Sequence, residues 1–271
     1  MLKPLHATFD QLRRTRRKAL IPFIMGGDPN LRTTSQLLLA LEDAGADLIE
    51  VGVPFSDPLA DGPIIQAASA RALSRGTTPG SVLDAVASVR SRLRVPVVCL
   101  SYWNPIVQFG RNGTPGSPDP FLRAASQSGL SGLIVPDLPV EEGALLRTAG
   151  ARAGISTVFL AAPTSPPDRL RAIARASEGF IYYVSITGTT GPRRALPPGL
   201  VHGVRQLKLL TTKPVCVGFG ISTPAQAATV ARIADGVIVG SALIHAMDRV
   251  KGHAAAVRSA AAFVRRLRAV V

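Results

Sequence analysis

The sequence is poor in the residues that build metal centres, catalytic triads and membrane spans. Its 271 residues include two cysteines and four histidines. The histidines form no His-x-x-x-His pair and none ends an apolar run, so a metal site or a Ser-His triad lacks its parts. No apolar stretch reaches the ~18 residues of a membrane span, and the N-terminal segment has no signal-peptide core. We therefore expect a cytoplasmic protein with no metal and no membrane attachment.

The cysteines are too few for a disulfide framework. Cys99 and Cys216 both lie inside apolar runs, which favours small buried side chains in a reducing compartment over a disulfide or a redox site.

Acidic side chains are also scarce, with 17 Asp and Glu against 31 Lys and Arg and a net charge of +14. Residues 1–150 carry a net +2 and residues 151–271 carry +12. Such an excess suggests a nucleic-acid partner, and the densest basic cluster is 13–18. Aromatic residues make up only 5% of the chain and few lie among the arginines, so stacking platforms are missing. We expect no nucleic-acid partner. A solvated helix face is favoured for 13–18, with a nucleic-acid-binding surface as the alternative.

Short apolar runs recur along the chain with helix-period segments between them. This alternation is typical of repeated βα units around a parallel sheet, and the runs are apolar throughout, as in strands buried on both faces. Eight runs in a chain of this length predict an α/β fold, a (β/α)8 TIM barrel, as a single domain over 1–271 with an N-terminal helix. The predicted strands are 20–25, 47–53, 97–100, 132–135, 157–161, 180–184, 215–218 and 236–239.

Helix-start signals precede several of the segments between these runs. Thr78-Pro79 and Thr223-Pro224 place a hydroxyl before a proline, and Thr33-Thr34 precedes another apolar period. The Gly- and Pro-rich segment 110–120 predicts a surface loop after the third strand.

Two carboxylates fall near the end of the second predicted strand, where a barrel of this kind places its chemistry. Glu50 interrupts the apolar run 48–53, and burial without a cation would raise its pKa toward that of a general acid. A structural ion pair with an arginine is the equally weighted alternative. Asp61 lies in the following loop and could act with Glu50, but a helix N-cap is favoured for it on the residues alone.

Glycines after the later strands predict a phosphate site. Gly218 and Gly220 permit close backbone approach, and Gly240-Ser241 opens a helix whose N-terminal N–H groups favour an anion. The segment 188–191 fits a mobile lid or a plain flexible loop. The chain has neither Gly-x-Gly-x-x-Gly nor a P-loop, so we expect no dinucleotide and no bound cofactor.

The motif LIEVGVPFSDPLADGP at 48–63 resembles the signature of the tryptophan synthase alpha subunit family. Further similarity extends along nearly the whole chain. The matching segments are 9–12, 21–23 with 27–29, 102–105, 134–139, 191, 217–222 and 235–241.

This resemblance implies a cofactor-free lyase that cleaves indole-3-glycerol phosphate to indole and glyceraldehyde 3-phosphate in tryptophan biosynthesis. Glu50 would protonate the indole carbon that bears the side chain, Asp61 would stabilise positive charge at the indole N–H, and Tyr182 would line the site. The other implied substrate contacts are Phe23, Leu100, Gly191, Phe219, Gly220, Gly240 and Ser241.

The resemblance also implies an alpha2-beta2 assembly with a beta subunit that holds pyridoxal phosphate and receives indole. Pro54, Asp57 and Pro58 match the loop that would face it. Thr189 and Ile64 depart from the residues usual in the family, and 110–120 is longer than usual. Alternatives are a stand-alone indole-releasing paralogue, a non-catalytic activator of a beta subunit, or another phosphate-binding barrel enzyme.

Overall fold

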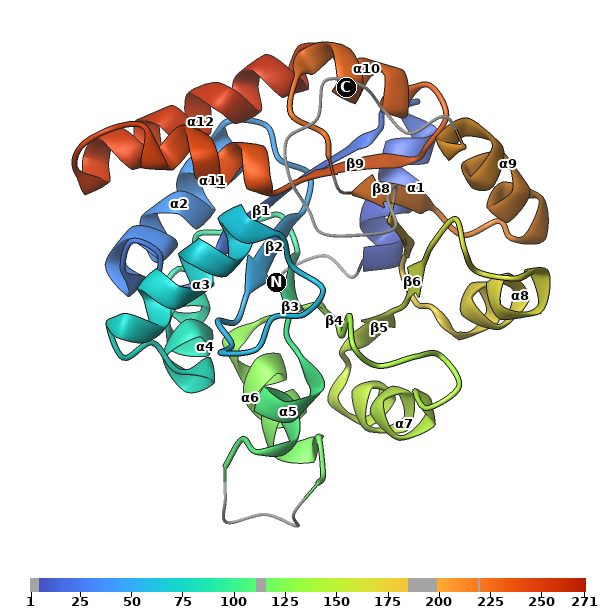
Figure 1. Cartoon of the computed structure of the whole chain (residues 1–271), viewed down its shortest axis with the longest axis horizontal. Coiled ribbons are helices and arrows are strands. Elements are labelled where there is room, and N and C mark those ends of the chain that lie inside the picture. The colour runs from blue at the N-terminus through green and yellow to red at the C-terminus, as the bar shows by residue number, and fades with distance from the viewer. Residues whose placement is uncertain (1–4, 111–115, 185–198, 219) are drawn as a thin grey trace.

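The strands form one parallel sheet that closes into a barrel (Figure 1). The computed structural model describes residues 5–110, 116–184, 199–218 and 220–271. The sheet order is β5-β4-β3-β2-β1-β9-β8-β7-β6, with parallel pairing throughout. The strands are β1 (Ala19–Met25), β2 (Ile49–Gly52), β3 (Val97–Leu100), β4 (Gly132–Ile134), β5 (Ser156–Val158), β6 (Leu160–Ala161), β7 (Ile181–Val184), β8 (Val215–Gly218) and β9 (Gly236–Val239).

The fifth predicted strand, 157–161, is divided in the structure. Its first half, β5, pairs with β4, and its second half, β6, pairs with β7. Between them, the Phe159 carbonyl accepts a hydrogen bond of 3.1 Å from the Tyr182 N–H. Since β5 and β6 together occupy one position, the ring has eight positions and the predicted eightfold barrel is confirmed. The division accompanies the change of partner at the point where the sheet closes.

The helices surround the strands (Figure 1). Their bounds are α1 (Leu5–Arg14), α2 (Leu31–Asp43), α3 (Pro63–Ser74), α4 (Pro79–Ala87), α5 (Trp103–Val107), α6 (Asp119–Ser128), α7 (Ala144–Ala153), α8 (Pro167–Ala176), α9 (Leu200–Leu210), α10 (Pro224–Ala231), α11 (Ser241–Asp248) and α12 (His253–Arg268). In the part of the chain that the structure describes, none is long and apolar enough to cross a membrane.

The apolar residues form two concentric layers because neighbouring residues on a strand point to opposite faces. In β2, Ile49 and Val51 belong to the outer cluster between strands and helices, whereas Leu48, directly before the strand, belongs to the inner cluster within the barrel. The same alternation in β3 places Val98 and Leu100 in the inner cluster. This parity determines which side chains can reach the barrel interior.

Helix α1 packs against the inner cluster and closes the end of the barrel where the strands begin. Leu5, Phe9 and Leu12 are buried with the inner residues, and the Phe9 and Phe180 rings lie 5.5 Å apart. A Cβ atom on Gly132, the first residue of β4, would lie 2.9 Å from Leu5 Cδ1. The opposite end, where the strands finish, is therefore the end available for chemistry.

Two of the three helix-start predictions are confirmed and one is corrected. Thr78 and Thr223 are N-caps in capping boxes. At α2 the N-cap is Asn30, whose side chain accepts from the Thr33 N–H, so Thr33 lies inside the helix. Of the predicted loop 110–120, residues 111–115 lie outside the described residues, and Asp119-Pro120 begins α6, where proline is tolerated in the first turn.

Candidate active site

Glu50 lies in the middle of β2 and faces the barrel interior. It is paired in register with Phe23 on one side and Val98 on the other, both of them inner residues. Its side chain is 1% exposed, and neither carboxyl oxygen has a hydrogen-bond partner among the described residues. No arginine or lysine of the described chain forms an ion pair with it. The structural ion-pair alternative is therefore wrong within these residues.

The surroundings of Glu50 favour its protonated form. Burial raises its pKa to about 8, and the negative charge of Asp61 adds to this effect. A carboxyl group of this kind holds a proton at neutral pH and can deliver it, which is the requirement for a general acid.

Asp61 is buried in the loop between β2 and α3. The N-cap of α3 is Gly62 and makes no side-chain capping bond, so the capping prediction for Asp61 is wrong. The Asp61 side chain is 5% exposed and accepts a 3.1 Å hydrogen bond at Oδ2 from the Tyr102 hydroxyl. The pKa of Asp61 is raised to about 6, because burial raises it by more than the Tyr102 hydrogen bond lowers it. The two carboxyls therefore carry different charges at neutral pH.

Tyr102 is a site residue to which the sequence analysis assigned no role. It follows β3, and its hydroxyl accepts a 3.0 Å hydrogen bond from the Ala60 N–H while donating to Asp61. The Phe55 ring lies 5.3 Å from the Tyr102 ring. These contacts hold the β2–α3 loop against the strand end. The position of Tyr102 after a strand is visible in the sequence, but the Asp61 partner 41 residues away is not.

The predicted aromatic and apolar contacts line the same interior. Phe23 and Leu100 belong to the inner cluster, and Phe23 is the register partner of Glu50. A Cβ atom on Gly240 would lie 3.1 Å from the Phe23 ring, and one on Gly52 would lie 2.7 Å from it. The Phe23 ring therefore packs between the end of β2 and the start of α11, which links the carboxylate region to the predicted phosphate region.

Tyr182 also lies inside the barrel, on β7. Its side chain is 5% exposed, and burial followed by the charges of Glu50 and Asp61 raises the pKa of its phenol well above 10. A Cβ atom on Gly218 would lie 2.5 Å from the Tyr182 hydroxyl, so glycine leaves room for this phenol.

The glycines predicted to hold phosphate end the neighbouring strands β8 and β9. Gly220 has a φ of +77°, a conformation that favours glycine. Gly240 is the N-cap of α11 and Ser241 is its first residue, so the unpaired N–H groups of the first turn open at this point. Gly191, Thr189 and Phe219, together with the predicted lid 188–191, lie outside the described residues.

The loop predicted to face a partner is only partly exposed. Asp57 is exposed and Pro58 is half-buried, whereas Pro54 is buried and supports the loop from within. Leu59 is 87% exposed, an apolar side chain that the sequence analysis did not single out. Ile64 packs against the inner cluster at the start of α3.

The described residues contain no group of three or more His, Cys, Asp or Glu side chains that could hold a metal ion. Cys99 and Cys216 are both buried and unpaired with each other, as predicted for small buried side chains.

Comparisons with known proteins agree with this arrangement. The family model for the tryptophan synthase alpha chain matches residues 9–271. The tryptophan synthase alpha chain of Gloeobacter violaceus is 53% identical over 237 residues, covering 87% of this chain and 83% of that relative. That of Geobacter sulfurreducens is 46% identical over 264 residues and 97% of each chain.

Solved structures give the same result for the fold. The tryptophan synthase subunit alpha of Legionella pneumophila superposes with a TM-score of 0.89 at 35% identity, covering 100% of this chain and 98% of that one. A chain of Mycobacterium tuberculosis tryptophan synthase superposes with a TM-score of 0.89 at 36% identity, covering 100% and 99%. The chain belongs to the tryptophan synthase alpha chain family.

Proposed function

We propose that Glu50 and Asp61 perform the family's reaction in this chain. The chain is a carbon–carbon lyase of tryptophan biosynthesis, and its reaction cleaves indole-3-glycerol phosphate to indole and glyceraldehyde 3-phosphate. The observation that carries the assignment is a buried Glu50 with no hydrogen-bond partner among the described residues, close enough to the hydrogen-bonded Asp61 for the Asp61 charge to raise the Glu50 pKa.

Glu50 is the acid and then the base. Its proton passes to the indole carbon that bears the glycerol chain, which leaves positive charge on the ring nitrogen. The bond to the side chain then breaks, its electron pair returns to the ring, and the adjacent hydroxyl loses a proton to become the aldehyde. That proton restores Glu50, so the step balances without a cofactor. A pKa of about 8 supports the initial protonated form.

Asp61 stabilises the positive charge that develops at the indole N–H. A carboxylate serves this purpose only when ionised, and its pKa of about 6 supports ionisation at pH 7 and above. Tyr102 positions the carboxylate by donating to Oδ2. Tyr182 lines the site beside the two acids.

We assign the substrate's two halves to the two ends of this region. Phe23 and Leu100 contact the indole ring. The phosphate is bound by backbone N–H groups of Gly240 and Ser241 at the α11 N-terminus and of Gly220 after β8. Gly191 and Phe219 complete these contacts in our proposal.

The family needs no cofactor, and its pyridoxal phosphate resides in the beta subunit. The structural neighbours include chains of tryptophan synthase, which is consistent with a beta-subunit partner. We propose an alpha2-beta2 heterotetramer in the cytoplasm in which the loop supported by Pro54 presents Asp57 and Pro58. We further propose that 1–271 acts as a single domain.

The experiment is to incubate the purified chain with indole-3-glycerol phosphate, with and without a beta subunit, and to measure indole and glyceraldehyde 3-phosphate. We expect both products in equal amounts, and more of them when the beta subunit is present. Strong activity that the beta subunit leaves unchanged would instead support a stand-alone indole-releasing enzyme. No product under either condition would contradict the proposal.

A further inference from the structure

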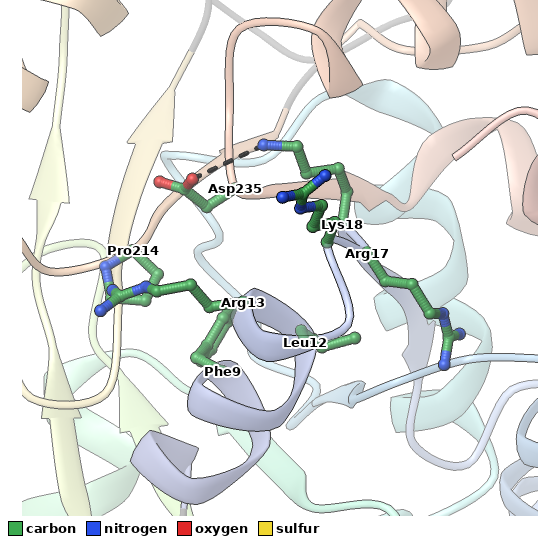
Figure 2. A pocket seen from close by; sticks show the side chains of 8 residues that line it. Phe9, Leu12, Arg13, Arg17, Lys18, Pro214 and Asp235 are labelled. Carbon is green, nitrogen blue, oxygen red and sulfur yellow. Dashed lines mark ion pairs between the residues drawn. The ribbon is translucent and has the colours of Figure 1, made fainter.

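A cavity with a basic rim lies at the opposite end of the barrel from the carboxylates. It has a volume of about 270 Å³, and we call it the basal pocket (Figure 2). Lys18 directly precedes β1 and Asp235 directly precedes β9, so the pocket lies where strands begin. Its lining residues are Phe9, Leu12, Arg13, Arg16, Arg17, Lys18, Pro214 and Asp235.

The basal pocket has more positive charge than its own carboxylates can balance. Asp235 pairs with Lys208 at 2.8 Å and with Lys18 at 3.7 Å, and also accepts from the Val215 N–H at 3.0 Å. The lining residue Arg17 pairs at 3.0 Å with Asp47, which also pairs with Arg268 at 2.6 Å. Each carboxylate therefore already serves two cations.

Arg13 and Arg16 are the two lining cations without an acidic partner among the described residues. Both side chains are exposed, and the Arg13 Nη2 donates to the Thr212 carbonyl at 3.0 Å, which fixes the side chain without a carboxylate partner. Figure 2 shows Arg13 extending toward Pro214 and Lys18 toward Asp235, whereas Arg17 turns to the other side.

The backbone at Arg16 has a conformation that usually belongs to glycine. Its φ is +54°, and it is the only non-glycine residue with positive φ in the described ranges. The Arg17 N–H donates to the Leu12 carbonyl and the Arg16 N–H to the Arg13 carbonyl, which is the Schellman pattern that ends α1. The helix dipole explains why a basic residue such as Arg13 lies at the C-terminus of α1. It does not explain why an arginine, Arg16, lies where the backbone favours glycine.

The floor of the basal pocket is apolar. Phe9 and Leu12 are buried and Pro214 is half-buried, so the cations surround a surface that suits a hydrophobic group. Guanidinium groups match the oxygens of phosphate and carboxylate groups. We propose that the basal pocket binds a small phosphate monoester that carries an apolar group, in contact with Arg13, Arg16 and Lys18.

Amide NMR shifts test this proposal because they report each site separately. The labelled chain is titrated with phenyl phosphate, with inorganic phosphate and with a ten-nucleotide single-stranded DNA. We expect saturable shifts at Arg16, Lys18 and Asp235, with phenyl phosphate binding more tightly than inorganic phosphate. Shifts at Gly240 and Ser241 report the catalytic end and are counted separately.

The variant Arg16→Gly removes one cation and supplies the residue that a positive φ favours, so it retains the fold. We expect its affinity for phenyl phosphate at the basal pocket to fall by about 10- to 100-fold, as for a lost charged hydrogen bond. The matched control is Arg14→Gln at the last residue of α1, because Arg14 does not line the pocket and its Nε donates to the Asp10 carbonyl. Its affinity should match that of the unaltered chain.

Three results would overturn the proposal. The first is the absence of saturable shifts at the basal pocket. The second is equal weakening by Arg14→Gln and Arg16→Gly, which would indicate only the general field of a basic surface. The third is tighter binding of the DNA than of phenyl phosphate, which would indicate a nucleic-acid surface.

Discussion

At pH 7 Glu50 is mostly protonated and Asp61 mostly ionised, although both are buried carboxyl groups in one site. The difference has a local cause. Glu50 has no hydrogen-bond donor among the described residues, whereas Asp61 has the Tyr102 hydroxyl. Pairs of acids whose pKa values are separated by their surroundings are a general means of assigning one acid and one base to a reaction.

The first prediction concerns the pH dependence of kcat/KM for indole-3-glycerol phosphate. Protonated Glu50 is lost as the pH rises through about 8, and ionised Asp61 is lost as it falls through about 6. We expect a bell-shaped profile with its maximum between these values. Steady-state rates from pH 5 to pH 9.5 would measure it, and a profile that rises continuously above pH 8 would contradict the role of Glu50 as acid.

The second prediction concerns Tyr102→Phe. The hydroxyl lowers the pKa of Asp61, so its removal raises that pKa and moves the acidic limb of the kcat/KM profile to higher pH. Activity should therefore fall more at pH 6.5 than at pH 7.5. The matched control is Tyr183→Phe, because the Tyr183 hydroxyl is buried without a hydrogen-bond partner in the described residues. An acidic limb that moves equally in both variants would refute a positioning role for Tyr102.

The third prediction concerns stability. Burial raises the pKa of Glu50 from its ordinary value of 4.5 to about 8 in the folded chain, so the folded state binds this proton more tightly. The group's stabilising contribution is present below pH 4.5 and is lost as the pH rises through about 8. Glu50→Gln cannot ionise, so we expect its Tm to increase relative to that of the unaltered chain between pH 5 and pH 8.5. Thermal melts at both values test this, and parallel melting temperatures would contradict it.

At the level of single residues, the sequence predicts burial more reliably than it predicts partners. The apolar run around Glu50 correctly indicates a buried acid, because strand parity depends only on neighbouring residues. The N-cap interpretation of Asp61 is wrong because Gly62 is the N-cap of α3. The Asp61 carboxylate accepts its hydrogen bond from the Tyr102 hydroxyl, which follows another strand, and not from a backbone N–H of α3. A contact between residues 41 positions apart leaves no pattern in the neighbouring sequence from which it could be predicted.

At the scale of elements, the apolar runs predict the positions of the strands accurately, and β3, β8 and β9 match the predicted bounds. The exception is the region around Phe159, where closure of the barrel divides one predicted strand into two. Asn30 is a second exception: its side chain caps α2, although Thr33 has the same capping chemistry. Closure and the choice between neighbouring caps depend on three-dimensional packing, which periodicity does not encode.

The fourth prediction concerns α1 as the cover of the barrel's N-terminal end. Phe9 is 4% exposed and packs on Phe180, so Phe9→Ala should lower the free energy of unfolding by about 3–5 kcal/mol. Leu209→Ala is the control because Leu209 is 79% exposed, and a change within about 0.5 kcal/mol is expected. Urea unfolding measures both. A small effect at Phe9 would show that α1 is dispensable for barrel stability.

At the scale of the whole molecule, the few acidic residues show more about the placement of the chemistry than the many basic residues do. Glu50 and Asp61 lie at the open end of the barrel, while Asp47 and Asp235 each bind two cations at the closed end. The basic residues behind the net charge of +14 therefore do not form a single binding surface. The two ends of the barrel have separate chemistry, with substrate cleavage assigned to one and the basal pocket to the other.

The most direct measurement of the central assignment is kcat for indole-3-glycerol phosphate cleavage by Glu50→Gln. Glutamine preserves shape and burial but has no acidic proton, so kcat should fall by about 10²- to 10⁴-fold with KM little changed. Glu42→Gln serves as the comparison, since Glu42 pairs with Arg94 away from the site, and its kcat should be unaltered. A Glu50→Gln enzyme with unchanged kcat would contradict the account.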